Sequence, residues 1–231
     1  MLRVGLTGSL GSGKTTVAAM LRELGAQVIE ADELGRAMME PGQAVYAEIV
    51  RVFGPAVVSL DGRLNRAKLA ELAFQGGRLD ELNAIVHPAV IAAQRVWLEQ
   101  VFGRDPQAVA VVESALIFEV ERDARARGES EGVLADWRNR FDRVVVITAP
   151  DELKLARYVA RIHPGGEGRD AVLADARLRL ARQIPDAEKA ARADYVLENT
   201  GGLAELRAEV AALWSRLRAE SNNPASPGSL E

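Results

Sequence analysis

Apolar residues are distributed along this chain of 231 residues in two alternating patterns. Short runs rich in Val, Ile and Leu are typical of parallel strands that are buried on both faces. They predict five strands, at residues 3–8, 26–32, 108–114, 143–149 and 194–200. Between the first two runs, Val17, Leu21 and Leu24 recur with helical spacing before Gly25. This strand–helix–strand order predicts a right-handed crossover unit of an α/β sheet.

Two long segments interrupt this alternation. Residues 33–105 contain helical patterns, at 43–54, 65–74, 78–86 and 88–103, but no strand pattern, so we expect a helical lobe there. Residues 155–192 are rich in arginine and include the glycine cluster 163–168, which is more typical of a lid than of a core. The predicted core therefore comprises residues 1–32, 106–154 and 193–218. The end of the chain, rich in Pro, Gly and Ser, predicts a disordered tail over residues 219–231, and the charged helical segment 119–140 is given no role.

Composition narrows the class of protein. The 29 Lys and Arg residues against 33 Asp and Glu residues give a net charge of −4, which offers no general footprint for nucleic acid or a membrane surface. No cysteine is present, so disulfides, thiolate metal sites and cysteine nucleophiles are excluded. No apolar run approaches the roughly 20 residues that span a bilayer, and the first apolar stretch is too short for a signal peptide. We expect a cytoplasmic protein, and the sequence implies no obligate protein partner.

The stretch GSLGSGKT follows the first predicted strand and precedes the first predicted helix. It matches the pattern G-x-x-x-x-G-K-[ST] through Gly8, Gly13, Lys14 and Thr15. Glycines permit backbone angles that turn N–H groups inward, and the positive end of the helix dipole adds to this anion site. We expect Lys14 to reach the β- and γ-phosphates of a nucleoside triphosphate, Thr15 to offer its hydroxyl to Mg²⁺, and Thr16 to reach the α-phosphate. The alternative is a glycine-rich turn with an unrelated lysine, which the matching strand and helix disfavour.

Two carboxylates stand at the ends of predicted strands. Asp32 ends the second strand, and parallel strands present their carboxyl ends at one edge, where ligands bind. Its carboxylate could accept the proton of a substrate hydroxyl, or it could instead cap the helix that begins near Glu33. Glu113 ends the third strand, where it could hold Mg²⁺ through water or simply pair with a neighbouring cation.

A phosphate-binding loop alone does not distinguish a kinase from a motor ATPase or a GTPase. A GTPase needs a guanine-reading N-K-x-D after a strand, and the corresponding strand ends here read TAPDE and ENTGG. A binding-only module leaves Asp32 without a purpose. The remaining alternatives are kinases that differ in their acceptor, which could be a nucleoside, a nucleotide or a small metabolite.

With these motifs assembled, the chain resembles the dephospho-coenzyme A kinases over about residues 3–204. The resemblance rests on VGLTGSLGSGKTT, EADELGR, VHPAV, LIFE, RYVAR and RQIPDAEKAARADYVLEN, in that order. It implies an α/β fold, a P-loop NTPase-type parallel sheet flanked by helices, with a helical acceptor-binding lobe (33–105) and an Arg-rich lid (155–192). It also implies transfer of the γ-phosphoryl group of ATP to the ribose 3′-hydroxyl of dephospho-coenzyme A with Mg²⁺, so ATP and dephospho-coenzyme A are the expected partners.

The resemblance assigns roles to residues of the loop and the acceptor lobe. Asp32 matches the acidic residue proposed as the base, and Arg36 either holds the acceptor or is an ordinary surface arginine. His87 shapes the substrate lobe, or starts a helix before Pro88, a residue suited to a first helical turn. Phe118 and Glu119 are expected to border the acceptor. The residues that match the ATP-phosphate loop are Gly11, Ser12, Gly13, Lys14, Thr15 and Thr16.

In the lid, Arg157 and Arg161 are four residues apart on one helical face, and both match the paired arginines of the family. The resemblance implies that they close over the ATP phosphates, and the alternative is a pair of solvated helix arginines. Asn199 is expected beside the adenine ring, or serves turn chemistry alone. Lys154, where a glutamine is frequent, and Glu113, where an aspartate is common, depart from the family pattern.

Overall fold

The computed structural model describes residues 1–163 and 168–223, which form two compact units. Unit 1 comprises Met1–Ile29 and Leu98–Glu231, and unit 2 comprises Glu30–Trp97. Most of the glycine cluster expected in a lid, residues 164–167, and the tail residues 224–231 lie outside the described residues. Each unit is described by itself below.

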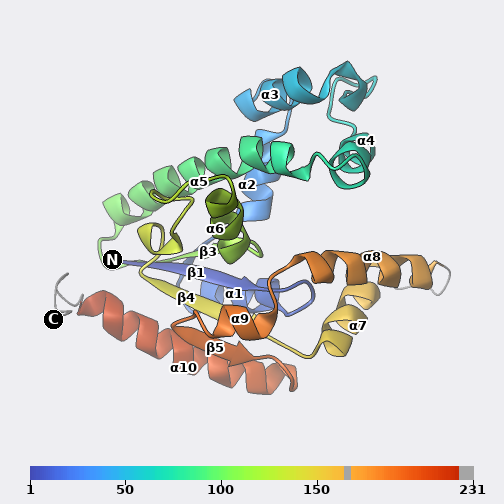
Figure 1. Cartoon of the computed structure of the whole chain (residues 1–231). Helices are drawn as coiled ribbons and strands as arrows, with labels where there is room; N and C mark the ends of the chain where they lie inside the picture. Colours follow the sequence, from blue (N-terminus) through green and yellow to red (C-terminus); the bar gives the residue numbers. More distant parts are fainter. Residues whose placement is uncertain (164–167, 224–231) are drawn as a thin grey trace. The chain divides into compact units, whose positions relative to one another are not determined.

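Unit 1 is built on a five-stranded sheet with the order β2-β3-β1-β4-β5 (Figure 1). The strands are β1 (Leu2–Gly8), β2 (Gln27–Glu30), β3 (Val109–Glu113), β4 (Arg143–Thr148) and β5 (Tyr195–Glu198). The central strand β1 pairs in parallel with β3 on one side and β4 on the other, so that Val4 lies opposite both Val111 and Arg143. The parallel sheet predicted from the apolar runs is confirmed. The loop that leaves β1 therefore emerges at the middle of the carboxyl edge of the sheet.

Both faces of β1 are covered, but its large apolar side chains, Leu2, Val4 and Leu6, lie on one face and alternate with Arg3, Gly5 and Thr7. Val4 and Leu6 are fully buried in a core with α1 (Lys14–Glu23) and α10 (Leu203–Asn222). On the opposite face, a Cβ on Gly5 would lie 2.7 Å from Ile117, in α6 (Ile117–Ala126), and 2.9 Å from Phe141. The absence of a side chain at Gly5 lets Ile117 and Phe141 pack close to the strand on this second face.

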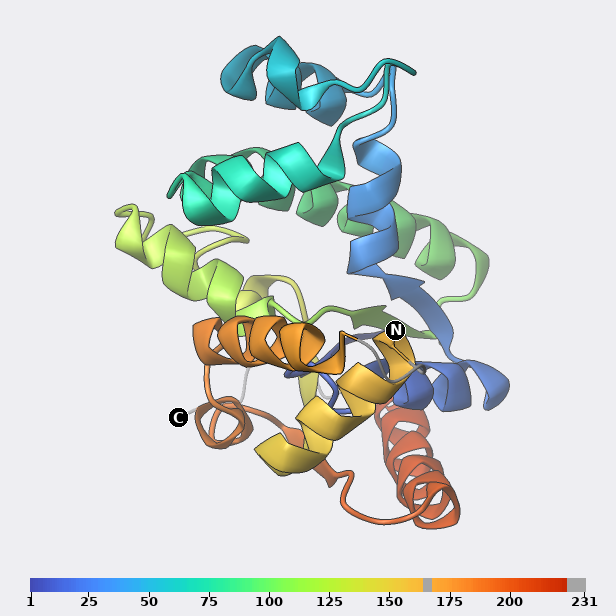
Figure 2. The ribbon, with the colours of Figure 1, turned by 90° about the vertical axis from the view of Figure 1, so that its right-hand side faces the viewer.

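The last helices of unit 1 differ in extent from the expectation. α7 (Asp151–Ile162) and α8 (Arg169–Arg182) pack against each other (Figure 2), and α9 (Asp186–Ala190) follows. α10 continues to Asn222, so residues 219–222 are helical and not part of a tail; the buried Ser221 donates a hydrogen bond to the carbonyl of Gln107 at 2.5 Å. The charged segment 119–140 contains α6 and the short helix η3 (Trp137–Asn139), and its buried Trp137 packs on Phe118.

Unit 2 is helical, with an isolated antiparallel bridge between Val58 and Leu64. Its elements are α2 (Ala31–Met38), α3 (Ala44–Phe53), η1 (Pro55–Val57), α4 (Arg66–Ala70), the π-helical η2 (Glu71–Gln75) and α5 (Leu79–Arg104), of which residues 79–97 belong to this unit. Ile49 and Val57 are fully buried at its core. The helical patterns expected between residues 43 and 103 are thus present. No helix in either described range, 1–163 or 168–223, is long and apolar enough to cross a bilayer.

One expectation for unit 2 is wrong: α5 is a single helix, not two helices at 78–86 and 88–103. Pro88 lies inside it, where it lacks an N–H to donate to the turn before it. Ile85, Val86 and Ala89, on both sides of Pro88, pack on the core of unit 2. Their burial outweighs one missing hydrogen bond, because tertiary packing supplies most of the stability of a protein helix. Pro88 therefore does not begin a helix, and His87 is not a helix-start residue.

Candidate active site

The loop between β1 and α1 has the backbone of an anion site. Gly11 and Gly13 adopt positive φ angles of 74° and 101°, which side chains of L-residues rarely allow. Gly13 is the N-cap of α1 and has no side chain to cap it, so the first N–H groups of the helix remain available to a ligand. The loop is closed by a hydrogen bond from the Ser12 N–H to the Ser9 carbonyl at 3.1 Å.

Three polar side chains lie at the start of α1. Lys14 Nζ donates to the Ser9 carbonyl at 3.1 Å, so its ammonium folds back along the loop. Thr15 and Thr16 are exposed in the first helical turn. A cation and two hydroxyls at the N-terminus of a helix can bind a polyphosphate.

The two positive-φ glycines also allow close packing against neighbouring elements. A Cβ on Gly13 would lie 2.2 Å from Asn199 Nδ2, and a Cβ on Gly11 would lie 2.1 Å from the carbonyl oxygen of Lys154 in α7. Either contact is far shorter than atoms allow. Glycine is therefore required at both positions by packing as well as by backbone angle.

Asn199, just after β5, links the loop to α7. Its side-chain Nδ2 donates to the Ser12 carbonyl at 2.8 Å, and its own carbonyl accepts from Arg157 Nη1 at 2.9 Å. Arg161 is exposed one turn later, over the ring of Tyr158. Loop, helix and strand end enclose a cavity of about 270 Å³, whose lining includes Gly11, Gly13, Thr16, Arg157, Arg161 and Asn199. Six residues singled out in the sequence are thereby brought to one place.

Glu113 is the last residue of β3 and lies opposite Leu6 of β1, two residues before the loop begins. It is buried, with 9% of its surface exposed, and it has interactions inside the protein. Its position at the end of β3 agrees with the prediction that Glu113 ends the third strand. Its expected part in holding Mg²⁺ through water stays a prediction.

Asp32 and Arg36 belong to unit 2, and their surroundings differ in one respect from the expectation. β2 ends at Glu30, which is also the N-cap of α2, so Asp32 is the second residue of that helix. It is neither the end of the strand nor the cap. A carboxylate in a first helical turn is stabilised by the helix dipole, which favours helix over strand here. Asp32 and Arg36 are both exposed, and within the described ranges neither has a polar partner.

The other predicted acceptor residues are less accessible than expected. His87 lies half-buried in α5 and has interactions inside the protein. Phe118 is fully buried, with the ring of Trp137 at its edge and the guanidinium of Arg192 over its face. Glu119 is 3% exposed. Phe118 and Glu119 thus take part in packing and ion pairing in unit 1, and their expected place beside the acceptor stays a prediction.

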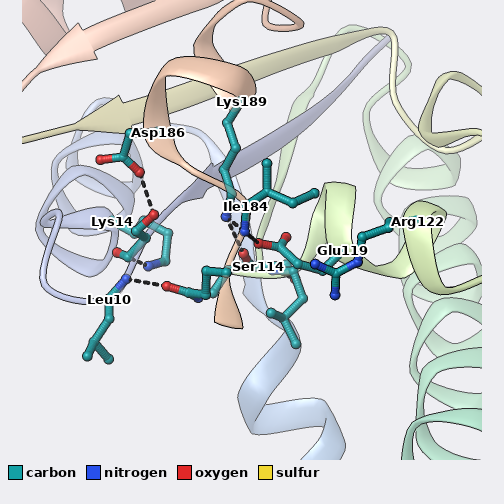
Figure 3. Close-up of polar contacts among 12 residues, drawn as sticks. Leu10, Lys14, Ser114, Glu119, Arg122, Ile184, Asp186 and Lys189 are labelled. Atoms are coloured by element: carbon teal, nitrogen blue, oxygen red, sulfur yellow. Dashed lines mark hydrogen bonds and ion pairs between the residues drawn. The ribbon is translucent and has the colours of Figure 1, made fainter. Parts of the chain in front are cut away.

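Four polar residues around the loop were given no role from the sequence: Lys154, Gln183, Asp186 and Lys189. Figure 3 shows Asp186 beside the loop that carries Lys14, and Lys189 beside Glu119 and Ile184. Apart from Asp151, which lies three positions before Lys154, their partners lie far away along the chain, so no local pattern could pair them. Gln183, Asp186 and Lys189 belong to the stretch RQIPDAEKAARADYVLEN, which contributed to the resemblance as a whole, and Lys154 was noted as a departure from the family pattern.

The buried ion pair between Lys189 and Glu119 is the innermost of these contacts. Lys189 Nζ lies 2.7 Å from Glu119 Oε1 and donates to the carbonyl of Ala115 at 3.2 Å. The same Glu119 oxygen accepts the Ile184 N–H at 2.9 Å. These contacts connect α9 and the segment before it to α6 and to the loop between β3 and α6.

Known proteins are similar to this chain over nearly its whole length. A family model described as dephospho-CoA kinase matches residues 2–129 and 131–205. A protein of Symbiobacterium thermophilum named dephospho-CoA kinase is 38% identical over 98% of this chain and 86% of its own length. Another of the same name, from Geobacillus kaustophilus, is 37% identical over 94% and 98%. The crystal structure of TT1252 from Thermus thermophilus, 34% identical, superposes with a TM-score of 0.68 over 94% of this chain and 97% of that one.

Proposed function

Since the chain belongs to the dephospho-CoA kinase family, it transfers a phosphoryl group from ATP to dephospho-CoA, and we propose which of its residues perform the transfer. The observation that carries the assignment is the cavity of about 270 Å³, in which the glycines of the loop, Thr16 and two arginines share one surface. We take the 3′-hydroxyl of the ribose as the acceptor group. The demand for ATP favours a cytoplasmic location.

The loop is proposed to bind the triphosphate of ATP. The N–H groups from Gly11 to Thr16 surround the phosphates, and Lys14 donates to the β- and γ-phosphates while one of its three ammonium N–H groups stays on the Ser9 carbonyl. Arg157 and Arg161 stabilise the charge that spreads over the transferring group. Asn199 supports the adenine side of the cavity, because its side chain is already fixed to the loop.

The transfer step needs a base and an open path for the hydroxyl. The acceptor oxygen forms a bond to the γ-phosphorus while the bond from that phosphorus to the bridging oxygen of ADP breaks. The proton of the hydroxyl passes to the Asp32 carboxylate, which is exposed and has no polar partner in the described ranges. Arg36 lies one turn further along α2 on the same side, where it would hold the acceptor near Asp32. His87 shapes the acceptor lobe.

The residues present fit a magnesium ion that is held mainly by substrate. Among the described residues, no group of three His, Asp or Glu side chains is placed to hold a metal. Mg²⁺ is usually bound by one or two protein oxygens together with substrate phosphates. Thr15 would supply its exposed hydroxyl, with Glu113 acting through water. A Mg²⁺ ion held by these residues would neutralise the charge that develops during phosphoryl transfer.

Replacing the proposed base tests this assignment. We expect Asp32→Asn to slow turnover by about 10²- to 10⁴-fold, the usual contribution of general base catalysis, and to leave ADP affinity nearly unchanged. Release of ADP from Mg-ATP would be followed with dephospho-CoA, AMP, nucleosides and small sugars as acceptors. Only dephospho-CoA should stimulate release strongly.

Glu33→Gln is the matched control, because Glu33 is the neighbouring exposed carboxylate of the same helical turn. It should keep the wild-type rate. If Asp32→Asn kept more than about a tenth of that rate, Asp32 would not be the base.

A further inference from the structure

The connector between α8 and α9 (residues 183–186, which include the first residue of α9) forms hydrogen bonds to the start of the phosphate-binding loop. The two loop residues that it contacts, Ser9 and Leu10, are called the Ser9–Leu10 corner below. Gln183 Oε1 accepts the Leu10 N–H at 2.9 Å, and the carboxylate of Asp186 accepts the hydroxyl hydrogen of Ser9. The paired residues are 173 and 177 positions apart in the sequence. The connector lies outside the nucleotide-binding motif, yet it fixes two consecutive residues of that motif.

Because Ser9 also bonds Lys14, the contact between Ser9 and Asp186 affects the lysine of the loop. The Ser9 carbonyl accepts from Lys14 Nζ and from the Ser12 N–H, both at 3.1 Å. The orientation of this one peptide group therefore decides where the ammonium lies. Because Lys14 serves the β- and γ-phosphates, the corner formed by Ser9 and Leu10 lies at the end of the loop where the phosphoryl group is transferred.

Lys154 of α7 forms an ion pair with Asp186. Its Nζ lies 2.7 Å from Asp186 Oδ2 and 2.8 Å from Asp151 Oδ1. The Lys154 and Asp186 side chains are 2% and 13% exposed, whereas that of Asp151 is 73% exposed. Charge-assisted hydrogen bonds are shorter and stronger than neutral ones, so Asp186 is held in one orientation by the buried lysine.

These side chains form the wall of a second cavity, of about 330 Å³, to which Arg177 of α8 also contributes. Ser9, Lys154, Gln183 and Asp186 all line it. A cavity beside the carboxylate leaves room for a small change in side-chain geometry. Conservative replacements of Asp186 are therefore compatible with the fold.

We propose that Gln183 and Asp186 are positioning residues for phosphoryl transfer, which hold the Ser9–Leu10 corner and through it the Lys14 ammonium at the γ-phosphate. Lys154 orients Asp186. None of these three side chains needs to touch ATP in this role. The inference rests on the proposed binding of ATP phosphates by the loop.

The test compares turnover with the affinity for ADP, which lacks the γ-phosphate. Asp186→Asn should lower kcat by about 10- to 100-fold, the range that small misplacements of catalytic groups produce. Ser9→Ala, which removes only the hydroxyl, should act in the same direction. The dissociation constant of Mg-ADP should change by less than about threefold in both variants, because ADP lacks the γ-phosphate and the N–H groups from Gly11 to Thr16 still hold its two phosphates. In the double variant the two effects should be less than additive, because both changes act on the contact between Ser9 and Asp186.

Asp175→Asn is the matched control, since it makes the same change to an exposed carboxylate of α8 whose partner is Arg179. It should keep the wild-type kcat. The inference is overturned if Asp186→Asn and Ser9→Ala both keep kcat within about twofold, or if ADP affinity falls in parallel with kcat. Should Asp186→Asn fail to fold, Ser9→Ala alone decides between these outcomes. A wild-type enzyme that binds no ADP would instead refute the proposed role of the loop.

Discussion

Lys189→Met should destabilise unit 1 more than any surface change. The side chain of Lys189 is fully buried, and its ammonium is the only cation bonded to the Glu119 carboxylate within the described residues. After the change, Glu119 keeps one hydrogen bond, from the Ile184 N–H to Oε1, and Oε2 already has no partner in the described structure. A carboxylate charge would remain buried without a counter-charge.

The size of the effect follows from that geometry. Removing one partner of a buried ion pair costs about 3–5 kcal/mol, because the remaining charge is left uncompensated. For a protein of this length, each kcal/mol lowers Tm by about 2–4 °C, so the expected loss is about 6–20 °C. Glu119→Gln combined with Lys189→Met removes both charges and keeps an acceptor for Ile184. The double variant should therefore be more stable than Lys189→Met alone.

Urea unfolding followed by tryptophan fluorescence measures this effect in the relevant unit. In a Trp97→Phe background the two remaining tryptophans, Trp137 and Trp214, both report on unit 1. A loss below about 1 kcal/mol for Lys189→Met, or a double variant as unstable as the single one, would refute the reasoning.

Arg140→Met is the matched comparison, because Arg140 is also a buried cation but forms no ion pair among the described residues. Burial lowers the pKa of Arg140 to about 10, against the opposing charges of Glu121 and Asp136. A lowered pKa means that the charged form disfavours folding at every pH below that value, so at pH 8 removal of the charge relieves a cost. Arg140→Met should therefore destabilise by less than about 1 kcal/mol.

Two further changes test the packing of the loop and of α5. Gly13→Ala should reduce turnover more than about tenfold, because the added Cβ would lie 2.2 Å from Asn199 Nδ2 and displace a side chain of the active site. Gly128→Ala, at a similar positive φ of 87° but with no atom within 4 Å, should keep its activity, which steady-state assays would show. Pro88→Ala should raise the free energy of unfolding of unit 2 by about 2 kcal/mol. Removing a proline from a helix interior gains about 3 kcal/mol, and the greater entropy of the unfolded chain offsets up to about 1 kcal/mol of that gain. Urea unfolding followed at Trp97 would measure this gain, and an unchanged midpoint would contradict it.

The parts of the fold that the sequence predicts are those determined by local pattern. The five strands lie in short runs rich in Val, Ile and Leu, and the loop motif is complete within residues 8–15, between a strand and a helix. Boundaries were less accurate where two local signals compete. Asp32 follows an apolar run and also suits a first helical turn, and Pro88 interrupts a pattern that packing keeps helical.

The residues missed in the site are polar groups paired across long distances in the chain. Lys154 and Asp186 are 32 positions apart, and Lys189 and Ala115 are 74 apart. A lysine or an aspartate in a helix reads as a surface residue, because these types are rarely buried unless paired. Only the folded chain shows which of them have found a partner.

The contact between Gly11 and α7 bears on how such loops are identified in other sequences. Position 11 is one of the four unspecified places in G-x-x-x-x-G-K-[ST], yet here the backbone of Lys154 leaves no volume for even a methyl group beside it. A consensus records only the residues that meet the nucleotide. The helix that packs against the loop also restricts which residues fit, here at Gly11. A search that gave weight to this third glycine would separate chains in which a helix packs this closely on the loop from chains in which none does.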